Sequence, residues 1–373
     1  MKTTDIMLKK ILELNAQKVT QTISEDDFPE TITPDFLKKA VRDYPLRGGK
    51  RLRSALLSWS CGLFGGNPES AKFAAAAVEI YHNWTLVHDD IIDNDLTRRN
   101  APSLHVSLAN FAENNYKNGS SVKFGQDFAI LAGDIQQGWA VNMMLKSLES
   151  GISHKTVIYL IKKLQEQVNR DLISGEALDV EFSYENPANI SKEQVEKMLY
   201  MKTGVLLEFA AVTGGIIALD KTFPPDISIP DMEALIKNNT QLKNIANFAS
   251  KAGTAFQLKD DWLGIFGDEK LLGKPIASDI AEAKPTILLL ETLDHIDNKE
   301  KKQLKSFIGR VSFTPSDIEL IKNIIRNSGA EQIVLEKSET LMKDAIKSLD
   351  HFKDSQYKTN LNLWADFLLR RKS

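Results

Sequence analysis

Apolar residues recur along most of the chain with the three- to four-residue spacing of amphipathic helices, and no run alternates convincingly between apolar and polar residues. The breaks between these runs carry turn-forming residues, as in Gly65-Gly66-Asn67-Pro68 and Pro224-Pro225. We therefore expect an almost entirely helical protein. The predicted helices span residues 4–20, 34–43, 50–64, 69–95, 126–149, 154–179, 191–219, 231–267, 284–292, 298–308, 315–327, 330–350 and 358–371.

Some of these helices are apolar around most of their circumference, as in the run from Phe73 to Val78. Helices of this kind belong inside a large bundle, because each of their faces must be covered. The chain has 373 residues and no recognisable linker. We therefore expect a single domain over residues 1–373, although that length would also allow two or three domains of average size.

Composition narrows the class of protein. A net charge of -3 argues against a general nucleic-acid binder, which would carry a dominant basic patch. The one cysteine, Cys61, excludes an intrachain disulfide and is expected to be a small apolar filler. Residues 1–10 lack the apolar core of a signal peptide, and the apolar stretch from Leu206 to Leu219 is interrupted by Glu208 and predicted to be too short to span a bilayer. We expect a soluble, cytoplasmic protein without a transmembrane segment.

Two aspartate-rich clusters, LVHDDIID at 86–93 and FQLKDDWLG at 256–264, each close an apolar helical stretch. Carboxylates in such places are costly to desolvate unless something positive meets them. On a helix Asp89 and Asp93 lie one turn apart, about 40° from alignment, so both can reach one ion while Asp90 points elsewhere. Oxygen ligands without Cys or His favour Mg²⁺, which completes its shell with water and substrate phosphates. The implied ligand is a diphosphate.

Basic residues add an anion site to this predicted metal site. The segment GGKRLR at 48–53 places a flexible turn before a helix, whose free N–H groups attract phosphate. Lys50 and Arg53 lie three residues apart and can grip one anion, while Arg98 and Arg99 offer forked donors that match phosphate oxygens. A solvated basic helix start would explain the first segment alone. Together with two acidic clusters, the basic residues favour a substrate site.

These motifs resemble those of the trans-isoprenyl diphosphate synthases, or E-type polyprenyl synthetases, over about residues 40–290. Residues 295–373 show only amphipathic helices and carry no such motif. The segments that carry the resemblance are GGKRLR at 48–53, EIYHN at 79–83, LVHDDIIDND at 86–95, RR at 98–99, ILAGD at 130–134, KTG at 202–204, FQLKDDWLGIFGD at 256–268, GKP at 273–275 and SD at 278–279.

The resemblance implies the all-α isoprenoid synthase fold, a large helical bundle around a central cavity, in a protein that is normally a homodimer. It also implies the reaction, which joins isopentenyl diphosphate to an allylic diphosphate (dimethylallyl, geranyl or farnesyl) with three Mg²⁺ ions. Departure of diphosphate from the allylic carbon gives a delocalised cation, which the double bond of isopentenyl diphosphate attacks. In this family the released diphosphate is the usual base.

The resemblance also implies roles for single residues. The positions that match the isopentenyl diphosphate site are Gly49, Lys50, Arg53, His82 and Arg99. Those that match contacts to the reacting allylic diphosphate are Arg98, Lys202, Thr203, Gln257, Lys274 and Lys284. Asp89, Asp93 and Asp260 match direct metal ligands, while Asp90 and Asp261 would orient metal-bound waters or basic neighbours. His82 lies seven residues before Asp89, two helical turns, and so shares its face.

Product length is read from the residues before the first acidic motif. In the family an aromatic residue at Trp84, a small residue at Thr85 and no insertion in DDIID suggest a geranylgeranyl product, and Tyr81 lies one turn deeper along the same helix. Farnesyl diphosphate is the close alternative. Ordinary aromatic packing would also explain Trp84, which an ideal helical wheel places to the side of the carboxylates.

The chain departs from the family pattern at four positions. Ser54 replaces a usual proline, Asn100 a glycine, Glu176 a glutamine, and Gly264 the last aspartate of the second motif. Residues 107–121 look like an insertion that forms a surface extension. Two other classes of protein remain: a class I terpene cyclase, which would not need GGKRLR, and a non-catalytic subunit of a heteromeric synthase, which would typically have lost an acidic motif.

Overall fold

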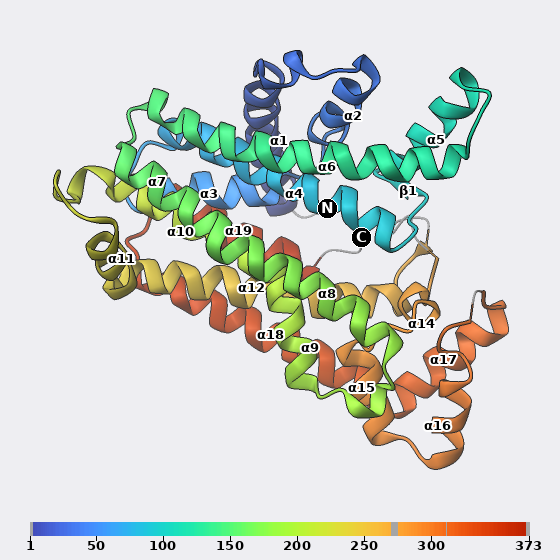
Figure 1. The fold of residues 1–373 in the computed structure, drawn as a ribbon. Helices are drawn as coiled ribbons and strands as arrows, with labels where there is room; N and C mark the ends of the chain where they lie inside the picture. Colours follow the sequence, from blue (N-terminus) through green and yellow to red (C-terminus); the bar gives the residue numbers. More distant parts are fainter. Residues whose placement is uncertain (1–2, 270–274, 311, 371–373) are drawn as a thin grey trace. The chain divides into compact units, whose positions relative to one another are not determined.

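The computed structural model describes residues 3–269, 275–310 and 312–370, and most of them lie in helices (Figure 1). The strands found in those ranges, β1 (Thr97–Arg98) and β2 (Ala101–Pro102), form a single antiparallel pair in which Arg98 faces Ala101. This agrees with the all-α fold predicted from the apolar spacing.

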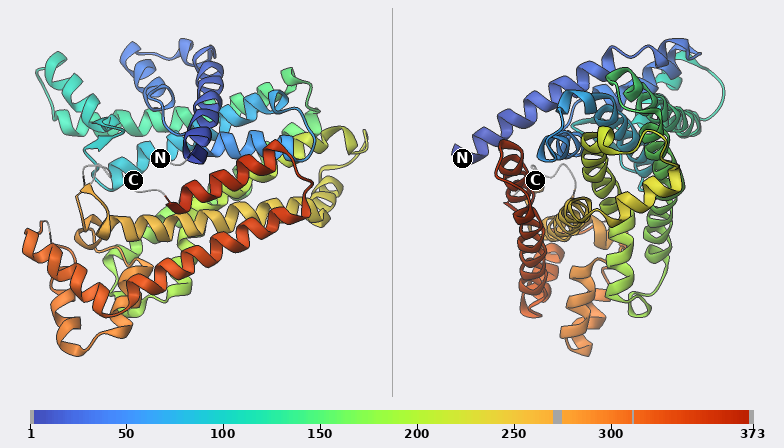
Figure 2. Two further views of the ribbon diagram at one scale, coloured as in Figure 1. Left: turned by 180° about the vertical axis from the view of Figure 1, so that it is seen from behind. Right: turned by 90° about the vertical axis from the view of Figure 1, so that its left-hand side faces the viewer.

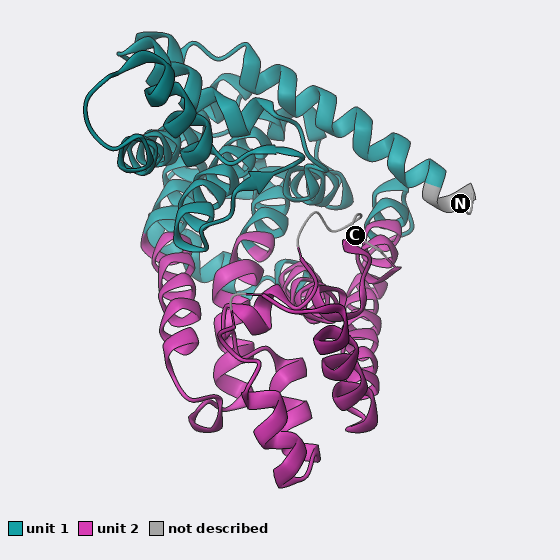
Figure 3. Cartoon of the chain, turned by 90° about the vertical axis from the view of Figure 1, so that its right-hand side faces the viewer, with its two compact units in different colours: residues 1–165, 209–243, 354–361 teal, residues 166–208, 244–353, 362–373 magenta. Residues whose placement is uncertain are grey.

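The chain divides into two compact units (Figure 3), made of residues 1–165, 209–243 and 354–361 and of residues 166–208, 244–353 and 362–373. The first contains α1 (Thr3–Ser24), α2 (Asp35–Leu46), α3 (Leu52–Leu63), α4 (Lys72–Ile92), α5 (Leu104–Asn115), α6 (Ser121–Leu145), α7 (His154–Lys163) and α11 (Ile229–Asn238). The second contains α8 (Arg170–Tyr184), α9 (Lys192–Leu199), α14 (Ser278–Ala281), α15 (Ile287–His295), α16 (Asn298–Lys305), α17 (Pro315–Asn327) and α18 (Ala330–Ser348). Three helices pass from one unit into the other: α10 (Val205–Leu219), α12 (Thr240–Phe266) and α19 (Gln356–Arg370). The expected single domain therefore stays a prediction.

In the first unit α4 and α6 run side by side (Figures 1 and 2). The alanine run of α4 is fully buried, which explains why this helix is apolar on nearly every side. The expected surface insertion at 107–121 is mostly helix α5, which folds back along α6 and buries Leu108 and Ala112. Gly125 permits this approach, because a Cβ there would lie 2.1 Å from the carbonyl oxygen of His105. The extension thus reduces to the exposed residues 113–120.

The core of the second unit gathers the apolar faces of α9, α15, α17 and α18 around Leu258 of α12. Two of these helices start with reciprocal capping boxes, Ser191 with Gln194 and Thr314 with Asp317. Each box satisfies N–H groups that have no partner inside the helix. The helix boundaries of this unit are therefore set by local side chains that the sequence displays.

Two predicted helices contain a wider turn. The run from α7 to α8 includes the π-helical segment η4 (Leu164–Asn169), and the run from α9 to α10 includes η6 (Tyr200–Gly204). The second run is helical from Lys192 to Thr222, which is long and apolar enough to cross a membrane by length and composition. The expectation that this stretch is too short is therefore wrong. Within this helix, 78% of the apolar 18-residue window is buried inside the protein, as in a core helix.

The short helices complete the chain between these elements. They are η1 (Phe28–Thr31), η2 (Pro68–Ala71), η3 (Lys146–Ser150), η5 (Pro187–Asn189), η7 (Asp220–Thr222) and η8 (Leu349–His351). The expected helix 231–267 is interrupted between α11 and α12, where the side chain of Asn239 accepts a hydrogen bond from the N–H of Leu242 at 3.0 Å. Asn239 thus acts as a cap for the second helix.

Candidate active site

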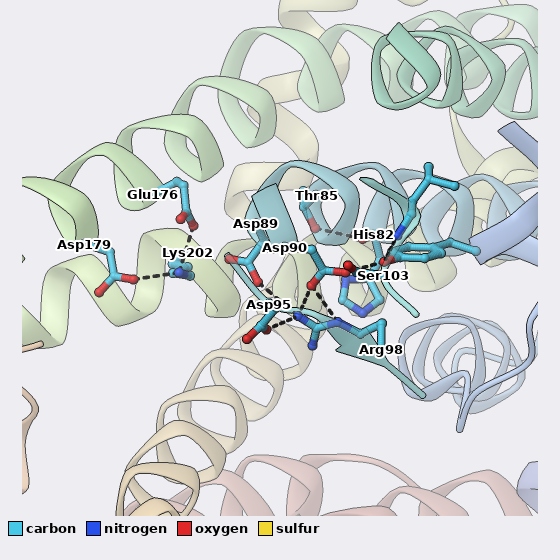
Figure 4. A network of polar contacts seen from close by, with 12 residues as sticks. His82, Thr85, Asp89, Asp90, Asp95, Arg98, Ser103, Glu176, Asp179 and Lys202 are labelled. Atoms are coloured by element: carbon cyan, nitrogen blue, oxygen red, sulfur yellow. Dashed lines mark hydrogen bonds and ion pairs between the residues drawn. The ribbon is translucent and has the colours of Figure 1, made fainter. Parts of the chain in front are cut away.

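The first acidic motif lies at the end of α4 in the first unit. Asp90 is buried, and its Oδ1 accepts a hydrogen bond from Nε of Arg98 at 2.7 Å, while its Oδ2 accepts one from the hydroxyl of Tyr44. Arg98 also donates to Asp95 at 2.7 Å and lies 3.8 Å from Asp89 (Figure 4). The guanidinium of Arg98 is thus held against the carboxylates of the motif.

Burial raises the pKa of Asp90, although the hydrogen bonds from Arg98 and Tyr44 act in the opposite direction. Burial also disfavours the charged form of Arg98, but its hydrogen bond to Asp90 and the nearby charges of Asp89 and Asp95 raise the pKa of Arg98 above its ordinary value. This arginine stays charged and compensates the motif when no metal is bound. Asp93 is the C-cap residue of α4 and lies one turn after Asp89.

The basic loop before α3 adopts a backbone that few residues tolerate. Gly48 and Gly49 have φ of 89° and 123°, and Arg51 has a left-handed φ of 48°. In the turn after the first acidic motif, Arg99 and Asn100 also have left-handed φ, 55° and 59°. Asn100 therefore occupies a position where glycine is the easiest choice and asparagine the next best. Backbone strain of this kind concentrates at functional sites.

Arg99 ties this turn to its neighbours. It donates to the carbonyl oxygens of Tyr44 at 3.1 Å and Gly48 at 2.5 Å, and to Oδ1 of Asn83 at 3.2 Å. A Cβ at Gly49 would lie 3.2 Å from its guanidinium carbon. The backbone at Gly49 and the guanidinium of Arg99 are therefore in close contact, and a side chain at position 49 would crowd this arginine.

The basic residues form a cluster that is short of negative charge. Burial lowers the pKa of Arg53 to about 10, and burial together with the charge of Arg51 lowers the pKa of Arg99 to about 10. Burial, followed by the charges of Arg53 and Arg99, holds the pKa of His82 well below its usual value. His82 is neutral near pH 7, and Lys50 is exposed at the edge of the cluster. A bound anion would relieve the repulsion between these cations.

In the second unit the π-helical turn η6 carries Lys202 and Thr203. Nζ of Lys202 lies 2.7 Å from Asp179 and 2.9 Å from Glu176, two carboxylates on α8 (Figure 4). Gly175 lets α8 approach, since a Cβ there would lie 2.4 Å from the backbone nitrogen of Lys202. The hydroxyl oxygen of Thr203 accepts a hydrogen bond from the Gln257 amide at 2.6 Å.

The second acidic motif lies on α12. Asp261 is half-buried as a residue, but its Oδ2 atom is buried and accepts no hydrogen bond from the described residues. Burial raises its pKa well above the usual value, and the charges of Asp279 and Asp179 raise it further, while Lys284 acts in the opposite direction. A side chain at Gly264 would lie 3.2 Å from the carboxylate of Asp279. Asp279 thus stands against the position where the family usually has its last aspartate.

The carboxylates around Asp261 fit a hard divalent cation, because they offer only oxygen ligands and their negative charges repel one another. One buried carboxylate oxygen, Oδ2 of Asp261, also has no hydrogen-bond donor among the described residues. Among the described residues, however, no three of the His, Cys, Asp and Glu side chains are already gathered closely enough to hold an ion. Asp89 and Asp93 belong to the first unit and Asp260 to the second. Their convergence on shared ions stays a prediction.

The remaining predicted residues fall in three places. Tyr81 and Trp84 are buried in α4 with ring centroids 4.8 Å apart, and the hydroxyl of Thr85 donates to the carbonyl oxygen of His82 at 2.8 Å. Nζ of Lys284 lies 2.8 Å from Glu282 and 3.9 Å from Asp179. Lys274 lies outside the described residues.

Sequence reasoning missed several residues that hold these groups in place. Tyr44 bonds Asp90 from helix α2, and Asp179 bonds Lys202 from α8. Asp279, Arg51 and Glu79 lie inside motifs that carried the family resemblance, but the sequence analysis assigned these three residues no role. For these last three the signal was their motif membership, whereas Tyr44 carried no signal in the sequence.

Comparison with known proteins identifies the family. The polyprenyl synthetase family model matches residues 34–325. The chain belongs to the polyprenyl synthetase family. Geranylgeranyl diphosphate synthase from Saccharolobus solfataricus is 39% identical over 283 residues, 75% of this chain and 73% of the relative. The enzyme of the same name from Sulfolobus acidocaldarius is 33% identical over 330 residues, 87% of this chain and 88% of the relative.

Solved structures of the family agree with the fold. Geranylgeranyl pyrophosphate synthetase from Pyrococcus horikoshii has a TM-score of 0.78 and 29% identity, covering 99% of this chain and 98% of that one. Geranylgeranyl pyrophosphate synthase from Corynebacterium glutamicum, complexed with isoprenyl diphosphate and magnesium, has a TM-score of 0.81 and 27% identity, covering 98% and 99%. The resemblance and the isoprenoid synthase fold predicted from the sequence are confirmed, and the protein is a prenyl-transferring enzyme.

Proposed function

We propose that this enzyme condenses isopentenyl diphosphate with an allylic diphosphate, in a Mg²⁺-dependent reaction, to give geranylgeranyl diphosphate. The observation that carries the proposal is that helix α4 bears both the carboxylates of the first acidic motif and residues of the cationic cluster. One end of this helix bears the carboxylates Asp89, Asp90 and Asp93. The same helix contributes Glu79 and His82 to the cluster of buried and half-buried arginines. A metal half-site and an anion site on one helix suit a substrate with a diphosphate group.

In this proposal Lys50, Arg53 and Arg99 hold the diphosphate of isopentenyl diphosphate, with neutral His82 as a further hydrogen-bonding partner. The cluster carries more positive than negative charge, so a diphosphate would be bound there in preference to a neutral group. Arg98 is held by Asp90 and Asp95 and contacts the allylic diphosphate from that position. Lys202, Lys274 and Lys284 are assigned to the same leaving group.

The reaction breaks the bond between the allylic carbon and its diphosphate, forms a carbon–carbon bond to isopentenyl diphosphate, and releases one proton, for which the departing diphosphate is the base. Mg²⁺, when bound, would neutralise charge on that leaving group, and Asp89, Asp93 and Asp260 would hold it, with three ions expected. The hydrogen-bonded pair of Thr203 and Gln257 presents neutral dipoles to the cation. Neutral groups stabilise a cation without trapping it as a covalent adduct.

We also propose a homodimer in the cytoplasm. Along α6 the apolar side chains of Ile130, Leu131 and Leu145 are 42 to 47% exposed. Ile130 and Leu131 are adjacent, and an exposed apolar patch is typical of a surface that a partner covers. Burial of the long apolar helix inside the protein, and a single buried cysteine, support a soluble protein of a reducing compartment. Light scattering of the purified protein tests the dimer.

Incubation with Mg²⁺, radiolabelled isopentenyl diphosphate and each allylic primer, followed by product sizing, tests the reaction. The proposal expects a labelled C20 product that disappears when EDTA removes the metal. A C15 product would identify the alternative, a farnesyl diphosphate synthase. A terpene cyclase would consume the allylic substrate without incorporating label, and a non-catalytic subunit would turn over neither substrate. The last two results would refute the proposal.

A further inference from the structure

A buried carboxylate, Glu79 of α4, lies within the cationic cluster of the first unit. Its residue is 2% exposed and that of Arg51 is 3% exposed. Nη1 of Arg51 lies 3.6 Å from Oε2 of Glu79, and Nη2 of Arg51 donates to the carbonyl oxygen of Pro45 at the end of α2. Because a buried charge persists mainly where it is paired, Arg51 is held inward by this carboxylate.

The same carboxylate holds the start of α3. Oε1 of Glu79 accepts a hydrogen bond from the N–H of Ser54 at 2.9 Å, and Ser54 lies in the first turn of that helix. N–H groups of a first turn have no partner inside the helix, and the N-cap residue Arg51 provides no side-chain cap. Glu79 therefore caps α3 from a neighbouring helix. A proline at position 54 would lack this N–H, so the serine adds a contact.

A second connection runs through Asn83, one turn further along α4. Its Nδ2 donates to the carbonyl oxygen of Glu79 at 2.6 Å, and its Oδ1 accepts from Arg99 at 3.2 Å. Arg99 in turn donates to the carbonyl oxygen of Gly48. The basic loop at residues 48–53 is thus attached to one turn of α4 near both of its ends.

The carboxylate of Glu79 acts on several of the nearby arginines. The carboxylate of Glu79 favours the charged forms of Arg53 and Arg99, whose pKa values burial lowers. Arg51 forms an ion pair with Glu79. Lys50 is exposed at the end of the loop, and Arg53 follows on the first turn of α3.

We infer that Glu79 is a positioning residue for the diphosphate of isopentenyl diphosphate, because it turns Arg51 inward and fixes the loop so that Lys50 and Arg53 meet the substrate. This inference rests on the proposed function. Glu79 acts through the loop and the cap of α3, and the substrate is contacted by other residues. The basic motif therefore contains one structural arginine beside its two binding residues.

The test is the variant Glu79→Gln, which keeps an oxygen for the N–H of Ser54 and removes the charge that pairs with Arg51. The KM for isopentenyl diphosphate should rise about tenfold or more, while kcat and the KM for the allylic substrate change by less than about threefold. The matched control is Asp26→Asn in the same unit, which removes a buried carboxylate 2.6 Å from Lys146. The control should leave both KM values unchanged.

A double variant separates charge pairing from general damage. Arg51→Met alone should raise the KM for isopentenyl diphosphate, because Glu79 is left buried without Arg51, whereas Arg51→Met with Glu79→Gln should restore most of it. If Glu79→Gln fails to fold, this pair of variants still decides the matter. Equal increases in both KM values, or a wild-type KM in Arg51→Met and the double variant, would overturn the inference.

Titration of inorganic pyrophosphate into wild type and Glu79→Gln by calorimetry gives a measure that does not depend on turnover. Binding should weaken by about tenfold in the variant. A wild-type protein that binds pyrophosphate but incorporates no label would refute the proposed function, and weaker pyrophosphate binding in Glu79→Gln would then still show that Glu79 positions an anion-binding loop. An active wild-type enzyme whose pyrophosphate affinity is the same in the variant would refute the inference alone.

Discussion

Removal of the Tyr44 hydroxyl tests how the first acidic motif is held. This hydroxyl is fully buried, donates to Asp90 and accepts the N–H of Leu104 at 3.0 Å. Leu104 is the first residue of α5, so its N–H has no partner inside that helix. In Tyr44→Phe the Asp90 carboxylate loses a donor, and the Leu104 N–H is left buried without an acceptor.

The expected cost follows from these two contacts. A hydrogen bond to a charged group contributes about 1.5–3 kcal/mol, and an orphaned buried donor costs about 1–3 kcal/mol. Because the two effects share one hydroxyl, we take a combined local cost of about 3 kcal/mol. Such a cost would lower the protection of the Leu104 amide against hydrogen exchange by about 100-fold. We also expect a lower kcat, since Asp90 orients Arg98.

The assay is hydrogen exchange followed by mass spectrometry on a peptide that includes Leu104, combined with steady-state kinetics. The control is Tyr159→Phe, a buried tyrosine of α7 whose ring lies 5.9 Å from the Nζ of Lys163. The control should leave exchange at Leu104 unchanged. If Tyr44→Phe also exchanges at the wild-type rate and keeps its kcat, the hydroxyl does not bridge Asp90 and α5, and the reasoning fails.

Four other outcomes are expected. Asp261→Asn should raise the melting temperature of the metal-free protein by a few degrees, because burial and Asp279 disfavour the charged carboxylate. The same variant should abolish turnover, and a lower melting temperature would contradict the prediction. Folding lowers the pKa of His82, so the unfolded chain takes up a proton at a higher pH than the folded one, and the free energy of unfolding falls as the pH drops below 6.5. In His82→Asn the melting temperature should fall less steeply over the same pH range. Trp84→Ala should lengthen the products, and an unchanged product distribution would show that Trp84 does not limit chain length. Glu176→Gln should lower the KM for the allylic substrate about two- to fivefold by removing one of the carboxylates that bind Lys202, and an unchanged KM would argue against that competition.

Much of the fold could be predicted because helix periodicity and capping residues are local properties. The end of α4 at Ile92 and the start of α17 at Pro315 lie within three residues of their predicted places. The break at Asn239 was missed, although asparagine is a common N-cap. The π-helical turns were not predictable, because their extra residue follows from packing between helices, as at Gly175 against Lys202.

The site could be predicted as a set of residues but not as an arrangement. Motif spacing identified Asp90 and Arg98, and the family resemblance implied that Asp90 would orient metal-bound waters or basic neighbours, one of which is Arg98. Motif spacing chose Lys50 and Arg53 as the anion grip and gave Arg51 no role, whereas the structure pairs Arg51 with Glu79. Which way an arginine turns depends on carboxylates that come from another helix, and no local pattern reports them.

The π-helical turn at Tyr200–Gly204 has a consequence for how this chain can change over evolution. Such a turn contains one more residue than an α-helical turn, and each residue of an α-helix rotates the chain by about 100°. Deleting a single residue there could therefore convert the bulge into regular α-helix without interrupting it. The deletion would leave the rest of α10 in register with its neighbours while moving Lys202 and Thr203 around the helix axis, so single-residue gaps between related sequences are most easily tolerated at this point.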